Sequence, residues 1–133
     1  HRVDRRQRQM CIRDSPEEAA VRVPLELYMR GHAEDDSAHM RAAFMPTARI
    51  ESVREGPLTS WDIDTYCARF KGQPAADEAT RRRSIDAIDI GGTAASAKIT
   101  LVHGAITFID YFVLLKTEAG WKIANKAFHA QPH

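Results

Sequence analysis

The chain has 133 residues, of which 44% are apolar, and this is enough for one compact domain with a single buried core. Its 19 lysines and arginines nearly balance its 18 aspartates and glutamates, so no overall field attracts nucleic acid or an anionic membrane. No apolar run reaches the roughly 18 to 20 residues of a membrane span. Nucleic-acid binding and membrane insertion are therefore excluded from the expected functions.

Residues 1–14 differ from the remainder of the chain. They hold five arginines against two aspartates and show little apolar periodicity, so we expect a disordered leader of non-native origin. The single domain then comprises residues 15–133. The two cysteines, Cys11 and Cys67, provide neither a disulfide framework nor a paired-cysteine metal motif, which favours a reducing cytoplasm.

Three helices are expected in the first half of the chain. The segment Ser15–Glu18 combines a serine cap, a proline and two acidic residues, which predicts a helix that continues to about Glu34. Either Asp36 or Ser37 caps a second, short helix. Ser60 is predicted to cap a third helix, because four residues behind it share the spacing of one helical face: Ile63, Tyr66, Cys67 and Phe70.

Strands dominate the second half of the chain. A short strand is expected at residues 49–54, and long strands are expected at 82–90, 94–103, 105–116 and 121–131. Arg81, Arg82 and Arg83 precede or begin the first long strand, and we expect a solvated edge rather than a phosphate site. Helices followed by a meander predict an α+β fold, in which a curved antiparallel or mixed sheet wraps three N-terminal helices as a cone.

Several segments resemble one known family. They are Tyr28-x-x-Gly31, Met40-Arg-x-Ala-Phe44 with Pro46 and Ala48, and the hairpin Asp110-Tyr111 to Trp121-Lys-Ile123-x-Asn125-Lys126-x-Phe128. Over about residues 16–129 the chain is similar to the lumazine-binding-like group of the nuclear-transport-factor-two-like (NTF2-like) superfamily. The resemblance implies a cone-shaped cystatin-like α+β barrel that often dimerises through its sheet. Ketosteroid isomerase and SnoaL-type cyclases share that fold, which also serves proteins that only bind or assemble.

Asp110 is the first candidate catalytic residue. It interrupts a strand that is otherwise apolar, and burial there would raise its proton affinity until it acts as a general base or hydrogen-bond donor. The alternative is a structural carboxylate bonded to Lys126, to a neighbouring strand or to a backbone amide. We favour this structural role, because buried charges are usually paired.

Tyr28 and His32 lie four residues apart on the first helix, so both can face one cavity. Tyr28 would donate a hydrogen bond to a substrate oxygen, and either His32 or His129 would move a proton. In the alternative, Tyr28 packs in the core, His32 lies at an exposed helix end and His129 belongs to a frayed tail.

The ligand-binding wall is expected to be largely aromatic. Its candidate residues are Met40, Phe44, Trp61, Tyr66, Phe70, His103 and Phe112. Core packing is the alternative, which we prefer for Phe44 and Phe70, and His103 is also a candidate turn residue. No His-Glu-x-x-His or paired-cysteine motif is present, so we expect no metal.

These observations predict a cytoplasmic homodimer whose cone binds a small apolar or aromatic molecule. Its activity would be acid/base chemistry without a cofactor, of the isomerase, dehydratase or cyclase type. The alternative is a non-catalytic ligand-binding or assembly module.

Overall fold

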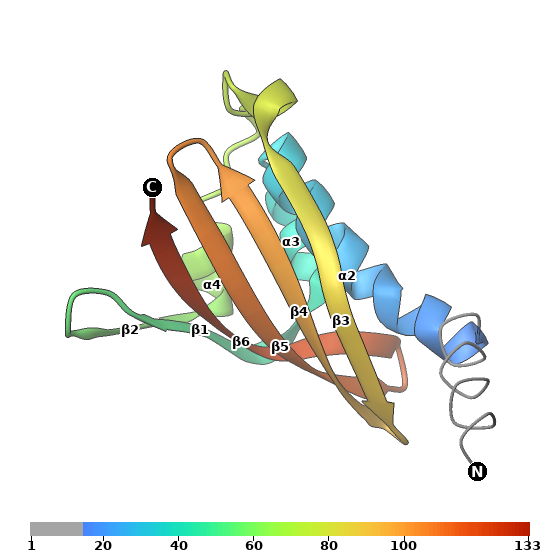
Figure 1. Ribbon diagram of the computed structural model, residues 1–133. Coiled ribbons are helices and arrows are strands. Elements are labelled where there is room, and N and C mark those ends of the chain that lie inside the picture. The colour runs from blue at the N-terminus through green and yellow to red at the C-terminus, as the bar shows by residue number, and fades with distance from the viewer. Residues whose placement is uncertain (1–14) are drawn as a thin grey trace, which may run out of the picture.

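A computed structural model describes residues 15–133, which form three α-helices, one short 3-10 helix and six strands (Figure 1). The expected disordered leader, with Cys11, falls on residues 1–14 and lies outside the described residues. Within the described residues, no helix is both long and apolar enough to cross a bilayer.

The first two helices begin where the sequence predicts. Helix α2 spans Pro16–Glu34, and Ser15 Oγ accepts a hydrogen bond of 3.0 Å from the backbone N–H three residues further on. Helix α3 spans Ser37–Ala43 and is capped in the same way by Asp36, also at 3.0 Å. Short polar side chains satisfy the free N–H groups of a helix start, so these caps are local and readable from sequence.

The prediction of a helix starting at Ser60 is wrong. Strand β2 occupies Leu58–Asp62, and helix α4 is limited to Ile63–Cys67 with Asp62 as its cap. Ser60 Oγ instead hydrogen-bonds two side chains of the neighbouring strand, β1 (Phe44–Val53). Pairing with that strand therefore overrides the capping tendency of the serine, because the same hydroxyl cannot serve both structures.

The remaining strands confirm the predicted meander with small differences at their ends. They are β3 (Arg82–Gly91), β4 (Ala94–His103), β5 (Ile106–Thr117) and β6 (Gly120–Pro132), and the 3-10 helix η1 (Glu78–Thr80) precedes them. The sheet order is β2-β1-β6-β5-β4-β3, in which only β1 and β6 pair in parallel. The result is a mixed sheet that curves over the helices (Figure 1).

Helices α2 and α3 lie behind the sheet in Figure 1, and the apolar core fills the layer between them. Leu25 of α2 packs there with Leu114 of β5 and Ile123 of β6, all at most 1% exposed. A Cβ on Gly31 would lie 2.9 Å from Met40 Cε, so this glycine lets α3 approach α2 closely. The α+β fold with three helices inside a curved sheet agrees with the prediction.

Candidate functional site at the mouth of the cone

Lys126, on β6, is the centre of a buried polar network. Its ammonium donates hydrogen bonds to the hydroxyls of Tyr28, at 2.6 Å, and Tyr66, at 3.1 Å. Tyr28 in turn donates to Asp110 Oδ2, and that oxygen lies 3.9 Å from Lys126 Nζ. The lysine side chain is 4% exposed and the aspartate is fully buried. The hydrogen bonds thus run in one direction, from the Lys126 ammonium through the Tyr28 hydroxyl to the Asp110 carboxylate.

Three aromatic rings surround the same ammonium. Nζ of Lys126 lies 4.7 Å from the ring centre of Tyr28, 4.9 Å from that of Tyr66 and 4.8 Å from that of Phe128. The negative faces of such rings attract a cation, which offsets part of the cost of removing it from water. The Tyr66 hydroxyl also lies 3.5 Å from Nε2 of His32, which extends the network to this imidazole.

Burial dominates the electrostatics of this network. It raises the pKa of Asp110, while Lys126 and the hydrogen bond from Tyr28 act in the opposite direction. Burial, and then the Asp110 carboxylate, raise the pKa of Tyr28 well above its usual value, so its hydroxyl keeps the proton. Asp110 Oδ1 is buried and has no hydrogen-bond partner in the described part of the chain.

Histidine protonation follows the same physics. Burial lowers the pKa of His32 well below its usual value, and the charge of Lys126 lowers it further, so this ring is neutral near pH 7. Burial lowers the pKa of His103 to about 4, helped by Arg83 and Arg81. Two neutral imidazoles therefore lie within a group of fixed cations.

A ring of half-buried side chains borders the network, and we call it the mouth ring: His32, Phe70, His103, Phe108 and Phe128. Successive ring centres are 5.2–6.0 Å apart in the series Tyr66, Phe70, His32, His103, Phe108 and Phe128. Phe128 and Tyr66 both contact the Lys126 ammonium, which closes the circle. Apolar ring edges thus frame one buried cation.

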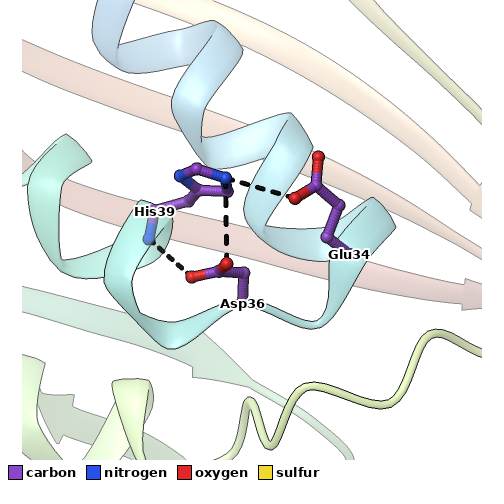
Figure 2. Close-up of side chains that lie close together, drawn as sticks. All are labelled: Glu34, Asp36 and His39. Atoms are coloured by element: carbon purple, nitrogen blue, oxygen red, sulfur yellow. Dashed lines mark hydrogen bonds and ion pairs between the residues drawn. The ribbon is translucent and has the colours of Figure 1, made fainter.

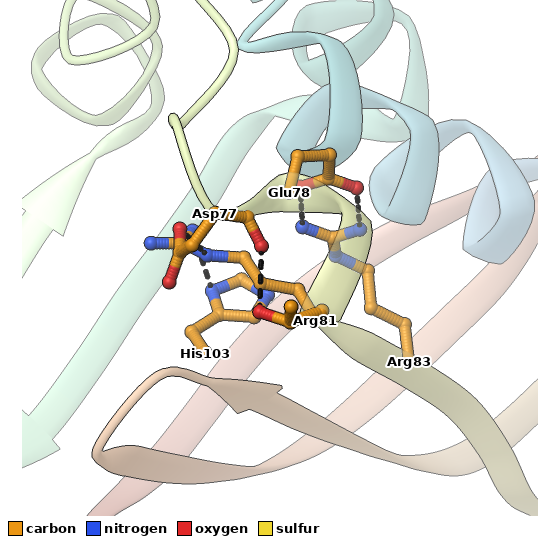
Figure 3. Close-up of polar contacts among 6 residues, drawn as sticks. Asp77, Glu78, Arg81, Arg83 and His103 are labelled. Atoms are coloured by element: carbon orange, nitrogen blue, oxygen red, sulfur yellow. Dashed lines mark hydrogen bonds and ion pairs between the residues drawn. The ribbon is translucent and has the colours of Figure 1, made fainter.

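Ion pairs from the η1 segment border His103 (Figure 3). Arg83 forms a two-bond pair with the carboxylate of Glu78, at 2.6 and 2.8 Å. Arg81 pairs with Asp77 at 2.9 Å, and its Nη1 lies 3.4 Å from Nδ1 of His103. The prediction that these arginines are all solvated is wrong for Arg83, whose side chain is 9% exposed, because alternate residues of β3 turn toward the interior.

The structure brings together most of the residues that the sequence proposed for the site. Tyr28 and Asp110 are hydrogen-bonded to each other, and four further candidates gather around Lys126 or in the mouth ring: His32, Tyr66, Phe70 and His103. Trp61 is half-buried beside them, with its ring centre 6.1 Å from that of Tyr66. The predicted partnership of Asp110 with Lys126 is confirmed, with Tyr28 between them.

Four other candidates are not part of the mouth ring. Phe44 and Phe112 contact Tyr28 from the core side, with ring centres 6.0 and 5.0 Å away. Met40, Phe44 and Phe112 are at most 4% exposed and belong to the apolar core. His129 is exposed and bonds Gln131 at 3.0 Å. Because side chains alternate along a strand, Phe128 faces the interior and His129 the opposite side, so His129 cannot share a site with Asp110.

Sequence reasoning named Lys126 only as a partner of Asp110, although the lysine also contacts Tyr28, Tyr66 and Phe128. The available signal was a lysine two residues from a phenylalanine on a strand with an apolar face. Lysine is rarely buried, so that signal alone is weak.

A second group of polar side chains lies on the surface where α2 meets α3 (Figure 2). His39 Nε2 lies 3.2 Å from Glu34 Oε1 and 3.8 Å from Asp36 Oδ2, and the three ligand-type atoms are within 4.8 Å of one another. Asp36 already caps α3, and that bond from His39 lowers its pKa. Capping and ion pairing account for this arrangement, and we assign no metal to it.

Two shallow hollows lie on the face of the sheet opposite the helices. The larger, of about 450 Å³, is bordered by Lys98, Tyr111, Val113 and Ala127 among others, and the smaller, of about 370 Å³, extends to Leu115. Neither touches Asp110, Tyr28 or Lys126.

Comparison with known proteins identifies the family of this chain and similar solved structures. A family described as "Putative lumazine-binding" matches residues 16–129. The chain belongs to this family. An NTF2-like protein of unknown function from Shewanella baltica OS155 is 33% identical to this lumazine-binding-like domain, over 88% of this chain and 95% of that chain, with a TM-score of 0.79. A comparison with curated proteins gives no significant match.

Two further solved structures are similar to the lumazine-binding-like domain. An NTF2-like protein of unknown function from Methylobacillus flagellatus KT is 29% identical, over 88% of this chain and 94% of that chain, with a TM-score of 0.75. A ketosteroid isomerase-like protein from Erwinia carotovora atroseptica SCRI1043 is 12% identical, over 90% and 99% of the two chains, with a TM-score of 0.65. At that identity the likeness shows the fold alone.

Proposed function

We propose that the domain binds a small, planar and mostly apolar molecule at the mouth ring. The observation that carries this proposal is the series of half-buried rings that begins at Phe70 and ends at Phe128, beside the buried ammonium of Lys126. Apolar walls with a few fixed polar groups are typical of small-molecule sites. The rings of Phe70 and Phe128 contact the apolar body of the ligand, and the polar groups of Lys126 and Tyr66 orient it.

A thermal-shift screen with steroids, terpenoids, quinones and flavins tests this binding. A molecule present at 100 times its Kd stabilises the folded state by about 2.7 kcal/mol, which raises Tm by several degrees. Trp61 fluorescence reports the same event, because its ring stacks on Tyr66. Phe128→Ala should remove the response, whereas Val23→Ala on the exposed side of α2 should keep it. A response that survives Phe128→Ala would place binding elsewhere.

One observation favours acid/base catalysis as a second candidate. Asp110 Oδ1 is buried without a partner among the described residues, and burial raises the pKa of this carboxyl group. A carboxyl group with a raised pKa holds a proton more readily than an ordinary aspartate, which suits a general acid or base. Its full burial argues for the structural role, however, because substrate atoms reach it only if Tyr28 or Lys126 moves. Binding is therefore our first candidate.

Asp110→Asn separates the two candidates. If Asp110 is catalytic, the variant loses turnover of any substrate found in the screen and keeps its affinity within a few fold. If Asp110 is structural, the variant unfolds at a lower temperature and shows no selective loss of turnover.

We also propose that two copies associate through the outer face of the sheet. Tyr111, Val113 and Leu115 of β5 are 54%, 51% and 41% exposed there, and they border the two hollows. Contiguous exposed apolar residues are typical of an interface. A second copy is the partner we favour, because the same patch on both copies makes a two-fold interface that closes on itself.

A cytoplasmic location remains part of this proposal. It is supported by Cys67, which is a free and buried thiol in the described part of the chain. Free thiols persist most readily in a reducing compartment. Targeting of a tagged full-length chain, followed by fractionation, tests the compartment directly.

A further inference from the structure

The guanidinium of Arg83 is held as a recognition group for a carboxylate. Its side chain is only 9% exposed, and two of its nitrogens bond the two oxygens of Glu78. A planar guanidinium matches a carboxylate in this two-bond geometry, which a lysine cannot reproduce. Glu78 belongs to the three-residue η1 and its side chain is 29% exposed, so the carboxylate is the more exposed partner of the pair that Figure 3 shows.

Two further donors beside this pair lack a partner. Nε of Arg83 and Nε2 of His103 are buried and make no hydrogen bond within residues 15–133. The Arg81 guanidinium can only donate, so the Nδ1 atom of His103 accepts, and the single proton of the neutral ring lies on Nε2. Both unpaired atoms are therefore N–H donors, and a buried donor without an acceptor costs free energy.

We propose that Arg83 is the carboxylate-recognition residue of the mouth ring and that Glu78 occupies it in the free protein. The inference rests on the proposed function and narrows its ligand to a planar aromatic molecule with a carboxylate group. The ligand carboxylate replaces that of Glu78 on Arg83, and η1 moves outward as Glu78 is released. Its aromatic body lies against His103 and Phe108, which join this pair to the mouth ring.

Calorimetric titration with naphthoate and with its uncharged amide, naphthamide, tests the proposal. Glu78→Gln removes the competing carboxylate, and naphthoate affinity should rise about tenfold because the binding-competent population grows. Naphthamide affinity should stay within about twofold, since the amide carries no charge to pair with Arg83. Asp77→Asn is the matched control, because it makes the same charge change in the same segment but frees Arg81.

Arg83→Lys keeps the charge and loses the two-bond geometry, so naphthoate should lose its advantage over naphthamide. The melting temperature of each variant is measured alongside to show that it is folded. Equal gains for Glu78→Gln and Asp77→Asn would mean a general charge effect and would overturn the assignment to Arg83. If naphthamide binds and no variant prefers naphthoate, the carboxylate requirement is refuted, whereas aromatic binding at the mouth ring stands. If neither molecule binds any folded variant, this inference is wrong, and the thermal-shift screen then decides the proposed function separately: a ligand found there keeps it, and the lack of any ligand refutes it.

Discussion

The two faces of β5 differ in burial and in the kind of side chain that they present. On the inner face, Asp110 and Phe112 are at most 2% exposed, and the carboxylate is tied into a hydrogen-bonded network. On the outer face, Tyr111 and Val113 are more than half exposed. Adjacent residues of one strand therefore face a buried polar interior and an uncovered apolar surface.

This contrast separates the structural role of the inner polar network from the binding role that we propose for the outer apolar face. A buried charge must be paired, so removal of one partner from the inner network destabilises the fold whether or not the network also meets a ligand. An exposed apolar face has no such need within one chain, so it points to a partner. Substitutions that are matched across the two faces can measure this difference.

Removal of the inner lysine should have the largest effect. Lys126→Met leaves the Asp110 carboxylate buried without its cation, and we expect a loss of about 3 to 5 kcal/mol in the free energy of unfolding. Chemical denaturation measures it. Lys98→Met on the outer side of β4, where the ammonium lies 5.8 Å from the Tyr111 ring, should cost less than about 1 kcal/mol.

The double variant Lys126→Met with Asp110→Asn should recover much of the loss, because no unpaired charge remains. A loss that persists in the double variant would show that packing, not charge pairing, dominates at Lys126.

Removal of the bridging hydroxyl should have the next largest effect. Tyr28→Phe deletes the group that accepts from Lys126 and donates to Asp110, and we expect a loss of about 1 to 3 kcal/mol in the free energy of unfolding. Tyr111→Phe is the outer-face control and should stay within about 0.5 kcal/mol. Equal effects in thermal or chemical denaturation would contradict the central role of Tyr28.

The inner face should also make stability depend on pH. His103 has a folded-state pKa of about 4, against an ordinary value of 6.5. Between these two values the unfolded chain binds a proton at His103 and the folded chain does not. Its contribution to stability is full above pH 6.5 and is lost as the pH falls toward 4. Asp110, whose pKa is raised, gives the opposite slope above its ordinary value of 3.8.

The difference between the melting curves of the wild type and His103→Gln isolates the histidine from Asp110. We expect the variant to lose less stability on acidification. His129→Gln removes an exposed histidine from the outer face and serves as the control. Parallel wild-type and His103→Gln curves would contradict the assigned pKa.

The outer face should give the smallest change in monomer stability and a clear change in assembly. Val113→Lys places a charge in the exposed patch of β5, so light scattering should show the molar mass falling from dimer to monomer. Unfolding of the monomer should change by no more than about 0.5 kcal/mol. Val23→Lys, at a similarly exposed valine on α2, should leave the dimer intact. A wild-type protein that is already monomeric would refute the dimer.

Much of the fold was readable because its signals are local. Ser15 and Asp36 cap helices with their own neighbours, and the four long strands follow from apolar patterning between turns. The misplaced helix start arose because strand pairing competes for the same group. Ser60 bonds across to β1 and so cannot cap a helix.

The sequence by itself determined an α+β cone, its family and an unusual carboxylate at Asp110. Only the tertiary structure decided what that carboxylate does, because its hydrogen bond joins residues 82 positions apart. Strand parity and sheet curvature likewise turned Lys126 and Arg83 inward and His129 outward. Charge pairing and burial are properties of the folded interior, and no spacing of residues along the chain specifies them.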